Sequence, residues 1–95
     1  MAEPSIDIDR ELMVLEAELK RLEAEYNMFF SGRAAKPPWE TRKRVETLVK
    51  QIDRLAVQNY GERFRFTSLQ SRFSAFVDLW DRGLRAREAH DPINR

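Results

Sequence analysis

The sequence predicts an all-α fold, in which two helices form an antiparallel coiled-coil helical hairpin and a third helix completes a three-helix bundle or a helix-exchanged dimer. Three segments lead to this prediction: a long heptad repeat of apolar residues, a second segment with the same period, and a third amphipathic segment. At 95 residues, the chain is expected to be one domain, 1–95, with frayed termini. The expected helices cover about residues 6–30, 38–59 and 67–89.

The first helix is predicted from an apolar stripe whose members are four and three residues apart in alternation, namely Ile8, Leu12, Leu15, Leu19, Leu22, Tyr26 and Phe29. Carboxylates occupy all the positions that flank this stripe, which are Asp9, Glu11, Glu16, Glu18, Glu23 and Glu25. A seam with acidic edges favours a less acidic helix opposite. The pattern therefore predicts helix-on-helix packing and a preference about the partner helix, and Gly32 is expected to end the first helix.

The second helix is expected to begin at Pro38, because proline suits the first turn of a helix. Its apolar stripe has the same period as the first and consists of Val45, Leu48, Ile52 and Leu55. The helix should end between Asn59 and Gly61. The two stripes together predict that the first two helices pack against each other along their length.

Charge also favours an antiparallel hairpin. Residues 1–30 have a net charge of −5, and residues 31–65 have a net charge of +5. Exposed pairs of this kind contribute only about 0.3 to 0.5 kcal/mol each, so they select the register while the apolar seam provides stability. The predicted pairing across the connection places Glu23 and Glu25 opposite Arg42 and Arg44.

The third segment follows Gly61. Residues 62–66 alternate charged and aromatic side chains, a pattern that predicts a short strand or an extended connector. Thr67 and Gln70 have capping-box spacing, so the third helix is expected to start at Thr67. Its stripe consists of Leu69, Phe73, Phe76 and Trp80. Gly83 is expected to weaken this third helix.

The composition argues against several classes of protein. With 42% hydrophobic residues, the chain is not expected to be disordered, and the lack of cysteine excludes disulfides and thiolate metal sites. No apolar run approaches a membrane span, and the start has no apolar leader, so a cytoplasmic location is expected. The one histidine, His90, has no ligands or nucleophile at recognisable spacing. We therefore expect no enzyme activity and no catalytic, cofactor-binding or metal-binding residues.

The expected function is protein–protein interaction through the apolar seam, which comprises Leu12, Leu15, Leu19, Leu22, Tyr26, Phe29, Val45, Leu48, Ile52, Leu55, Leu69, Phe73, Phe76 and Trp80. The expected partner is a second copy in a homo-oligomer, such as a dimer, or another helical protein. Five apolar residues lie outside the main stripes: Met13, Val14, Met28, Val49 and Val57. The sequence leaves open whether they are buried within the chain or against another molecule.

The alternative function is an anion-binding regulator that contacts a nucleotide second messenger or RNA. Guanidinium groups bind phosphate, and aromatic rings stack on bases. The candidate residues are Arg33, Lys36, Trp39, Arg42, Arg44, Arg63 and Arg65. The competing interpretation is structural: these cations neutralise the acidic first helix, and the aromatic residues close the core.

Four strings of residues carry a resemblance to a known kind of module. They are Tyr26 to Gly32, Pro37 to Arg42, Gln58 to Phe66 and Leu69 to Phe73. Together they resemble a bacterial helical module of myxobacteria and related groups, in which similar segments occur as short proteins and at the ends of longer signalling proteins. The resemblance implies a bacterial cytoplasmic setting and a regulatory context, and it provides no established activity or binding residues to transfer to this chain.

Overall fold

The computed structural model describes residues 7–89, which form three α-helices and contain no strand. The helices are α1 (Ile8–Phe30), α2 (Trp39–Arg54) and α3 (Tyr60–Ala89). The prediction of an all-α fold is confirmed for this part of the chain. The predicted helix start at residue 6 and the histidine at position 90 lie outside the described residues.

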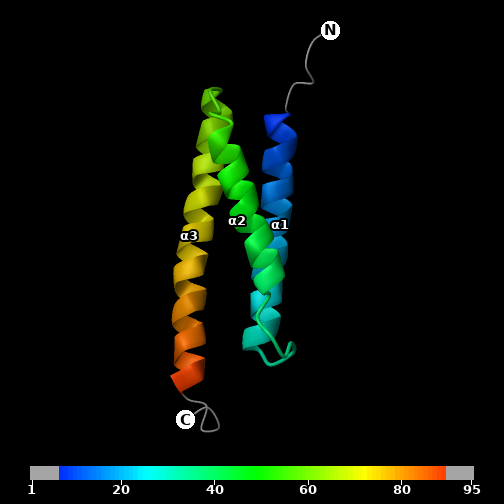
Figure 1. The fold of residues 1–95 in the computed structure, drawn as a ribbon, viewed down its shortest axis with the longest axis vertical. Helices are drawn as coiled ribbons and strands as arrows, with labels where there is room; N and C mark the ends of the chain where they lie inside the picture. Colours follow the sequence, from blue (N-terminus) through cyan, green and yellow to red (C-terminus); the bar gives the residue numbers. More distant parts are fainter. Residues whose placement is uncertain (1–6, 90–95) are drawn as a thin grey trace.

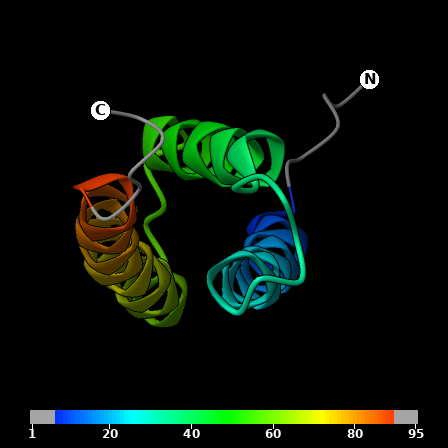
Figure 2. The same ribbon diagram turned by 90° about the horizontal axis from the view of Figure 1, so that it is seen from below.

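The three helices lie side by side along a molecule of 62 × 22 × 19 Å (Figure 1). The chain direction reverses between α1 and α2 and again between α2 and α3, so α1 and α3 run in the same direction. Viewed along the long axis, the helices stand at the corners of a triangle (Figure 2). Both α2 and α3 contact α1 of the same chain, so α1 organises the packing.

Local hydrogen bonds define both ends of α1. The carboxylate of Asp7 accepts a hydrogen bond from the backbone amide of Arg10 at 3.2 Å, which caps the first turn. At the other end, Gly32 has a φ of +86°, a left-handed conformation that glycine adopts without strain. The amide of Arg33 then donates to the carbonyl of Met28 at 2.8 Å. This arrangement ends the helix and turns the chain toward α2.

The second helix is shorter than predicted. It begins at Trp39, and the carbonyl of Pro38 accepts the amide of Arg42 at 3.0 Å. It ends at Arg54 rather than near residue 59, because Ala56 adopts a positive φ of +52° that interrupts the helical hydrogen bonding. Leu55 therefore lies outside α2 at its C-cap, where it remains half-buried.

The third helix starts earlier than predicted. The side-chain oxygen of Asn59 accepts the amide of Glu62 at 3.0 Å, which caps a helix that begins at Tyr60 and not at Thr67. The prediction of a strand or connector over residues 62–66 is wrong, because all five residues are helical. Five residues of alternation hardly distinguish a period of two from one of 3.6, and here the helical period buries Phe66.

The core runs along the space between the three helices. Its buried residues come from every helix and are Leu12, Leu15, Leu19, Leu22, Tyr26, Val45, Ile52, Phe66, Leu69, Phe73 and Trp80. Val49 and Val57 pack against this cluster, so these two residues are partly covered within the chain. Across residues 7–89, no helix combines the length and the apolar character that crossing a bilayer requires.

Candidate functional site

The predicted apolar seam lies inside the molecule. Its buried members are Leu12, Leu15, Leu19, Leu22, Tyr26, Phe29, Val45, Ile52, Leu69, Phe73 and Trp80. Its half-buried members are Leu48, Leu55 and Phe76. Because the chain's own helices enclose most of these side chains, a surface that is open to another molecule must lie elsewhere.

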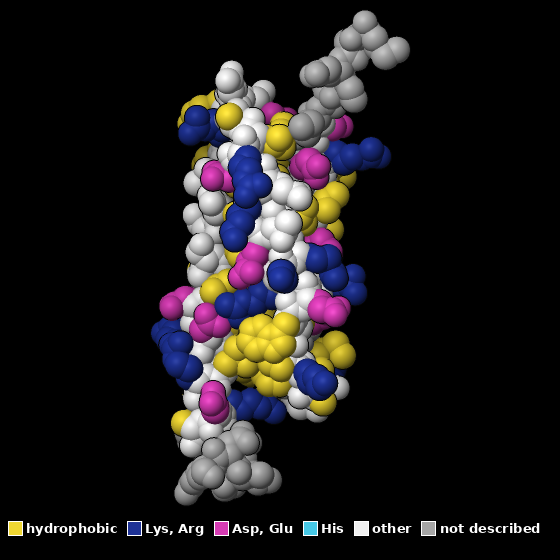
Figure 3. Space-filling view, in the orientation of Figure 1, with side chains coloured by type: hydrophobic (Ala, Val, Ile, Leu, Met, Phe, Trp, Pro, Cys, Tyr) yellow, Lys and Arg dark blue, Asp and Glu magenta, His cyan; other side chains and the backbone are white. Residues whose placement is uncertain are grey.

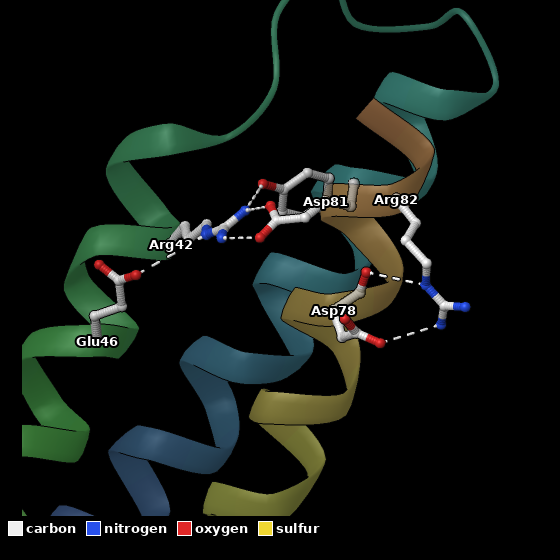
Figure 4. A network of polar contacts seen from close by, with 6 residues as sticks. Arg42, Glu46, Asp78, Asp81 and Arg82 are labelled. Carbon is white, nitrogen blue, oxygen red and sulfur yellow. Dashed lines mark hydrogen bonds and ion pairs between the residues drawn. The ribbon is translucent and has the colours of Figure 1, made fainter. Parts of the chain in front are cut away.

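Arg42 connects all three helices near the connection between α1 and α2 (Figure 4). Its side chain is only 12% exposed. Its guanidinium donates to both carboxylate oxygens of Asp81 on α3, at 2.9 and 3.2 Å. The same group donates to the hydroxyl of Tyr26 on α1 at 2.9 Å, and it lies 4.0 Å from Glu46 on its own helix. Arg42 therefore already makes three hydrogen bonds to partners within the protein itself.

Aromatic rings surround this polar centre. Tyr26 stacks on Trp80 with 4.2 Å between ring centroids, and Trp80 stacks on Phe76 at 5.1 Å. The guanidinium of Arg42 lies 5.6 Å from the ring centroid of Trp39. Trp39 thus lies against the guanidinium of Arg42, while 54% of the residue remains exposed.

The ion pair changes the titration of both groups. The hydrogen bond from Arg42 lowers the pKa of Asp81 below its ordinary value, although partial desolvation opposes the change. The hydrogen bond to Asp81 raises the pKa of Arg42, again against desolvation. Both groups are consequently charged at neutral pH, and Asp81 already occupies the edge of the guanidinium that bears Nη1 and Nη2.

The other central cations of the predicted anion site also bind carboxylates. Arg44 on α2 donates to Glu18 at 3.0 Å. Arg65 on α3 donates to Asp9 at 2.9 Å and to Glu16 at 3.3 Å. These ion pairs join different helices, as the structural interpretation of the basic residues predicts.

The predicted pairing of Glu23 and Glu25 with Arg42 and Arg44 is wrong. Glu23 forms an ion pair with Arg72 on α3 at 2.9 Å, and Glu25 pairs with Arg21 on its own helix at 3.4 Å. The two acidic edges of α1 lie on opposite sides of its apolar stripe and so face different helices. The edge with Glu18 faces α2, and the edge with Asp9, Glu16 and Glu23 faces α3.

Two further arginines that join helices, Arg72 and Arg87, are not among the residues predicted from the sequence. Arg72 follows Arg65 by seven residues, as Glu23 follows Glu16, so the two ion pairs repeat between helices that run in the same direction. The equal seven-residue spacing of these arginines and glutamates could have predicted the two ion pairs from the sequence. Arg87 lies over the ring of Phe29 at 4.6 Å and donates to the Phe29 carbonyl at 3.4 Å.

The seven predicted anion-binding residues do not form one site. Arg33, Lys36, Trp39, Arg42 and Arg44 lie around the connection between α1 and α2, whereas Arg63 and Arg65 lie in the first turns of α3. The contacts of Arg42 and Arg65 on α1 are separated by 10 to 17 residues, which corresponds to about 15 to 25 Å along a helix. Among residues 7–89, Arg33, Lys36 and Arg63 have no ion pair.

Several large apolar side chains remain at the surface. On α1, Met13 is 57% exposed and Met28 is 45% exposed, and Val14 is also exposed. Figure 3 shows hydrophobic side chains gathered where the chain passes from α1 into α2, the region in which Trp39 is exposed. On α3, the exposed large apolar residues are Tyr60, Phe64 and Leu79. Within the described part of the chain, no group of three His, Cys, Asp or Glu side chains could hold a metal ion.

Comparison with known proteins leaves these surfaces without a precedent to guide their interpretation. No protein-family profile, curated protein or solved structure matches the chain.

Proposed function

We propose that the chain is a non-enzymatic helical module for protein–protein interaction or oligomerisation, with a regulatory role. The observation that carries the proposal is the exposure of Met13, Val14 and Met28 along one helix whose opposite side is buried. Large apolar side chains that recur on the exposed side of one helix are typical of a region that another protein covers. Methionine suits such a surface because its flexible side chain adapts to the partner.

The proposal includes a particular packing of the helices. In it, α1 and α2 form an antiparallel hairpin of coiled-coil type, and α3 completes a three-helix bundle. The heptad spacing on α1 and the contacts of α1 with both other helices support this arrangement. The arginine–carboxylate pairs between α1 and its neighbours would then select the helix order.

Anion binding is less well supported as a function. Arg42, Arg44 and Arg65 already hold carboxylates of the protein, so a phosphate would have to displace these internal partners. Such displacement costs the interactions that join the helices. Of the seven predicted anion-binding residues, only Arg33, Lys36 and Arg63 are cations without an ion pair among residues 7–89, and they are divided between the two ends of the molecule.

Native mass spectrometry of the protein purified gently from its own cells tests the proposed function. We expect a mass that corresponds to several protein chains, either copies of this chain or this chain with another protein. A bare monomer at every concentration, or a monomer that carries a nucleotide or an RNA fragment, would contradict the proposal. If the wild type carried a nucleotide or an RNA fragment and the Arg63→Ala variant did not, the result would instead favour the anion-binding regulator.

A further inference from the structure

The side of α1 that faces away from the core presents a second apolar stripe. Met13, Ala17, Ala24 and Met28 are all exposed, and their spacing places them on one helix face. In Figure 2, α2 and α3 lie on one side of α1 and leave its opposite side open. A hollow at one end of this face is lined by Met13, Val14, Ala17 and Arg10.

Two cations near the middle of the face are drawn away from the stripe. Lys20 pairs with Glu16 at 3.9 Å, and Arg21 pairs with Glu25 at 3.4 Å. At 100° per residue, Lys20 and Arg21 project to opposite sides of the line through Ala17 and Ala24. The pairs pull each cation further outward, so small side chains occupy the centre of the face.

The sequence of this segment is close to a palindrome. Residues 16–25 read EAELKRLEAE, which is unchanged on reversal except for the central Lys-Arg pair. The symmetry extends outward to methionines at both ends, so that residues equidistant from the centre match: Met13 with Met28, Ala17 with Ala24, and Lys20 with Arg21. An antiparallel copy about a two-fold axis places each residue opposite its counterpart, so this symmetry matches methionine with methionine and alanine with alanine.

We propose that a second copy of this chain docks on the outer face of α1, with the two α1 helices antiparallel and the two-fold axis between Lys20 and Arg21. The inference rests on the proposed function and names its partner. Met28 of the second copy stands opposite Met13 and enters the hollow beside it. The alanines allow the two helices to approach closely.

The charges on each flank sum to zero in this arrangement. On one flank of the contact, the two Lys20 side chains lie between the two Glu16 carboxylates, and on the other flank the two Arg21 side chains lie between the two Glu25 carboxylates. Each flank is therefore a neutral row at the rim, and no unpaired charge is buried. The matched segment spans about 24 Å of helix, which is a small interface, so the dimer dissociates on dilution.

Sedimentation velocity over a concentration series tests the dimer. The disrupting variant is Ala17→Glu with Ala24→Glu, which places four carboxylates at the centre of the contact. We expect its dimer dissociation constant to be at least about tenfold higher than that of the wild type. Leu79→Glu, at a 55% exposed position on α3, is the matched control and should leave the constant unchanged. Circular dichroism confirms that each variant keeps its helices.

Disulfide cross-linking tests the antiparallel orientation, since the natural chain contains no cysteine. The two single variants Met13→Cys and Met28→Cys are oxidised separately and as an isotopically labelled mixture. We expect dimers that contain one chain of each variant in the mixture and little cross-linking of either variant alone, because like positions lie about 22 Å apart along the helix axis. Efficient cross-linking of Met13→Cys with itself would overturn the orientation.

A wild type that stays monomeric up to about 1 mM would overturn the inference. A dimer that persists unchanged in the double glutamate variant would overturn it as well, because it would use another face. In either case, a complex with a different protein in the native mass spectrum would leave the proposed function standing. A bare monomer both in sedimentation velocity and in the native mass spectrum would overturn the α1 dimer and the proposed function together.

Discussion

Arg42 on α2 and Asp81 on α3 form a two-point ion pair across the molecule, with hydrogen bonds of 2.9 and 3.2 Å. The pair is unequally buried, since the side chain of Arg42 is 12% exposed and that of Asp81 is 38% exposed. The hydroxyl of Tyr26 on α1 binds the same guanidinium. A contact of this kind contributes mainly by keeping a buried cation paired.

Asp81→Ala should lower the free energy of unfolding by about 1 to 2 kcal/mol, because it leaves the guanidinium of Arg42 with only part of its hydrogen bonds. The loss stays below that of a fully buried pair, because water reaches the site that the carboxylate vacates. Urea unfolding followed by circular dichroism measures the change. Asp78→Ala is the control, since Asp78 pairs with Arg82 at the surface and its loss should cost less than about 0.5 kcal/mol. Equal losses of stability in the two variants would contradict a larger contribution from the ion pair between Arg42 and Asp81.

The same ion pair should make stability depend on acid. The hydrogen bond from Arg42 lowers the pKa of Asp81 below 3.8, so the folded state binds this proton less tightly than the unfolded state. The contribution is present above about pH 3.8 and disappears as the pH falls through the lower pKa of the folded protein. We expect the stability difference between wild type and Asp81→Asn to be constant from pH 7 to pH 5 and to shrink below that. A difference that grows with acid would contradict this linkage.

Gly83 allows Phe30 to lie directly against α3, since a Cβ atom at this position would stand 2.9 Å from a ring carbon of Phe30. In the wild type, Gly83→Ala should therefore bring little gain, because the ring must move. In a Phe30→Ala background, the same substitution should stabilise the helix by up to about 1 kcal/mol through helix propensity alone. A double-mutant cycle by urea unfolding measures the coupling. The same effect in both backgrounds would show that the ring does not constrain position 83.

The start of α3 gives a direct test of its cap. Asn59→Ala should lower the free energy of unfolding by about 1 kcal/mol, because the amide of Glu62 loses its side-chain acceptor. Thr67→Ala should be neutral or slightly stabilising, since Thr67 is an exposed residue inside the helix. Urea unfolding of both variants checks the order. A larger loss for Thr67→Ala would restore the helix start predicted from its capping-box spacing.

Much of the secondary structure could be predicted from local patterns. The stripe from Leu12 to Phe29 is buried as predicted, and Gly32 follows the end of α1. The boundaries of the connection between α2 and α3 differ from the prediction, although Asn59 and Glu62 have the spacing of a capping pair in the sequence. The early end of α2 had no comparable signal, because the positive φ of Ala56 reflects the path to α3 and not a preference of alanine.

The candidate site was less predictable than the helices. The arginines at positions 42, 44 and 65 were identified as chemically distinctive, but the sequence left their partners open between phosphate and carboxylate. Their contacts with the other helices come from residues 16 to 56 positions away in the chain. Such distances are set by the order and direction of the helices, which a helical repeat does not specify.

The spacing of apolar and acidic residues determined that this chain is helical and which face of α1 is buried, because helix periodicity is a local property of the chain. The tertiary structure alone decided that one acidic edge of α1 serves α2 and the other serves α3. It also decided that Asp81 accepts hydrogen bonds from the Arg42 guanidinium and that Met13 and Met28 of α1 stay exposed. These outcomes depend on where three rigid helices meet, and side chains find their partners only after that packing brings them together.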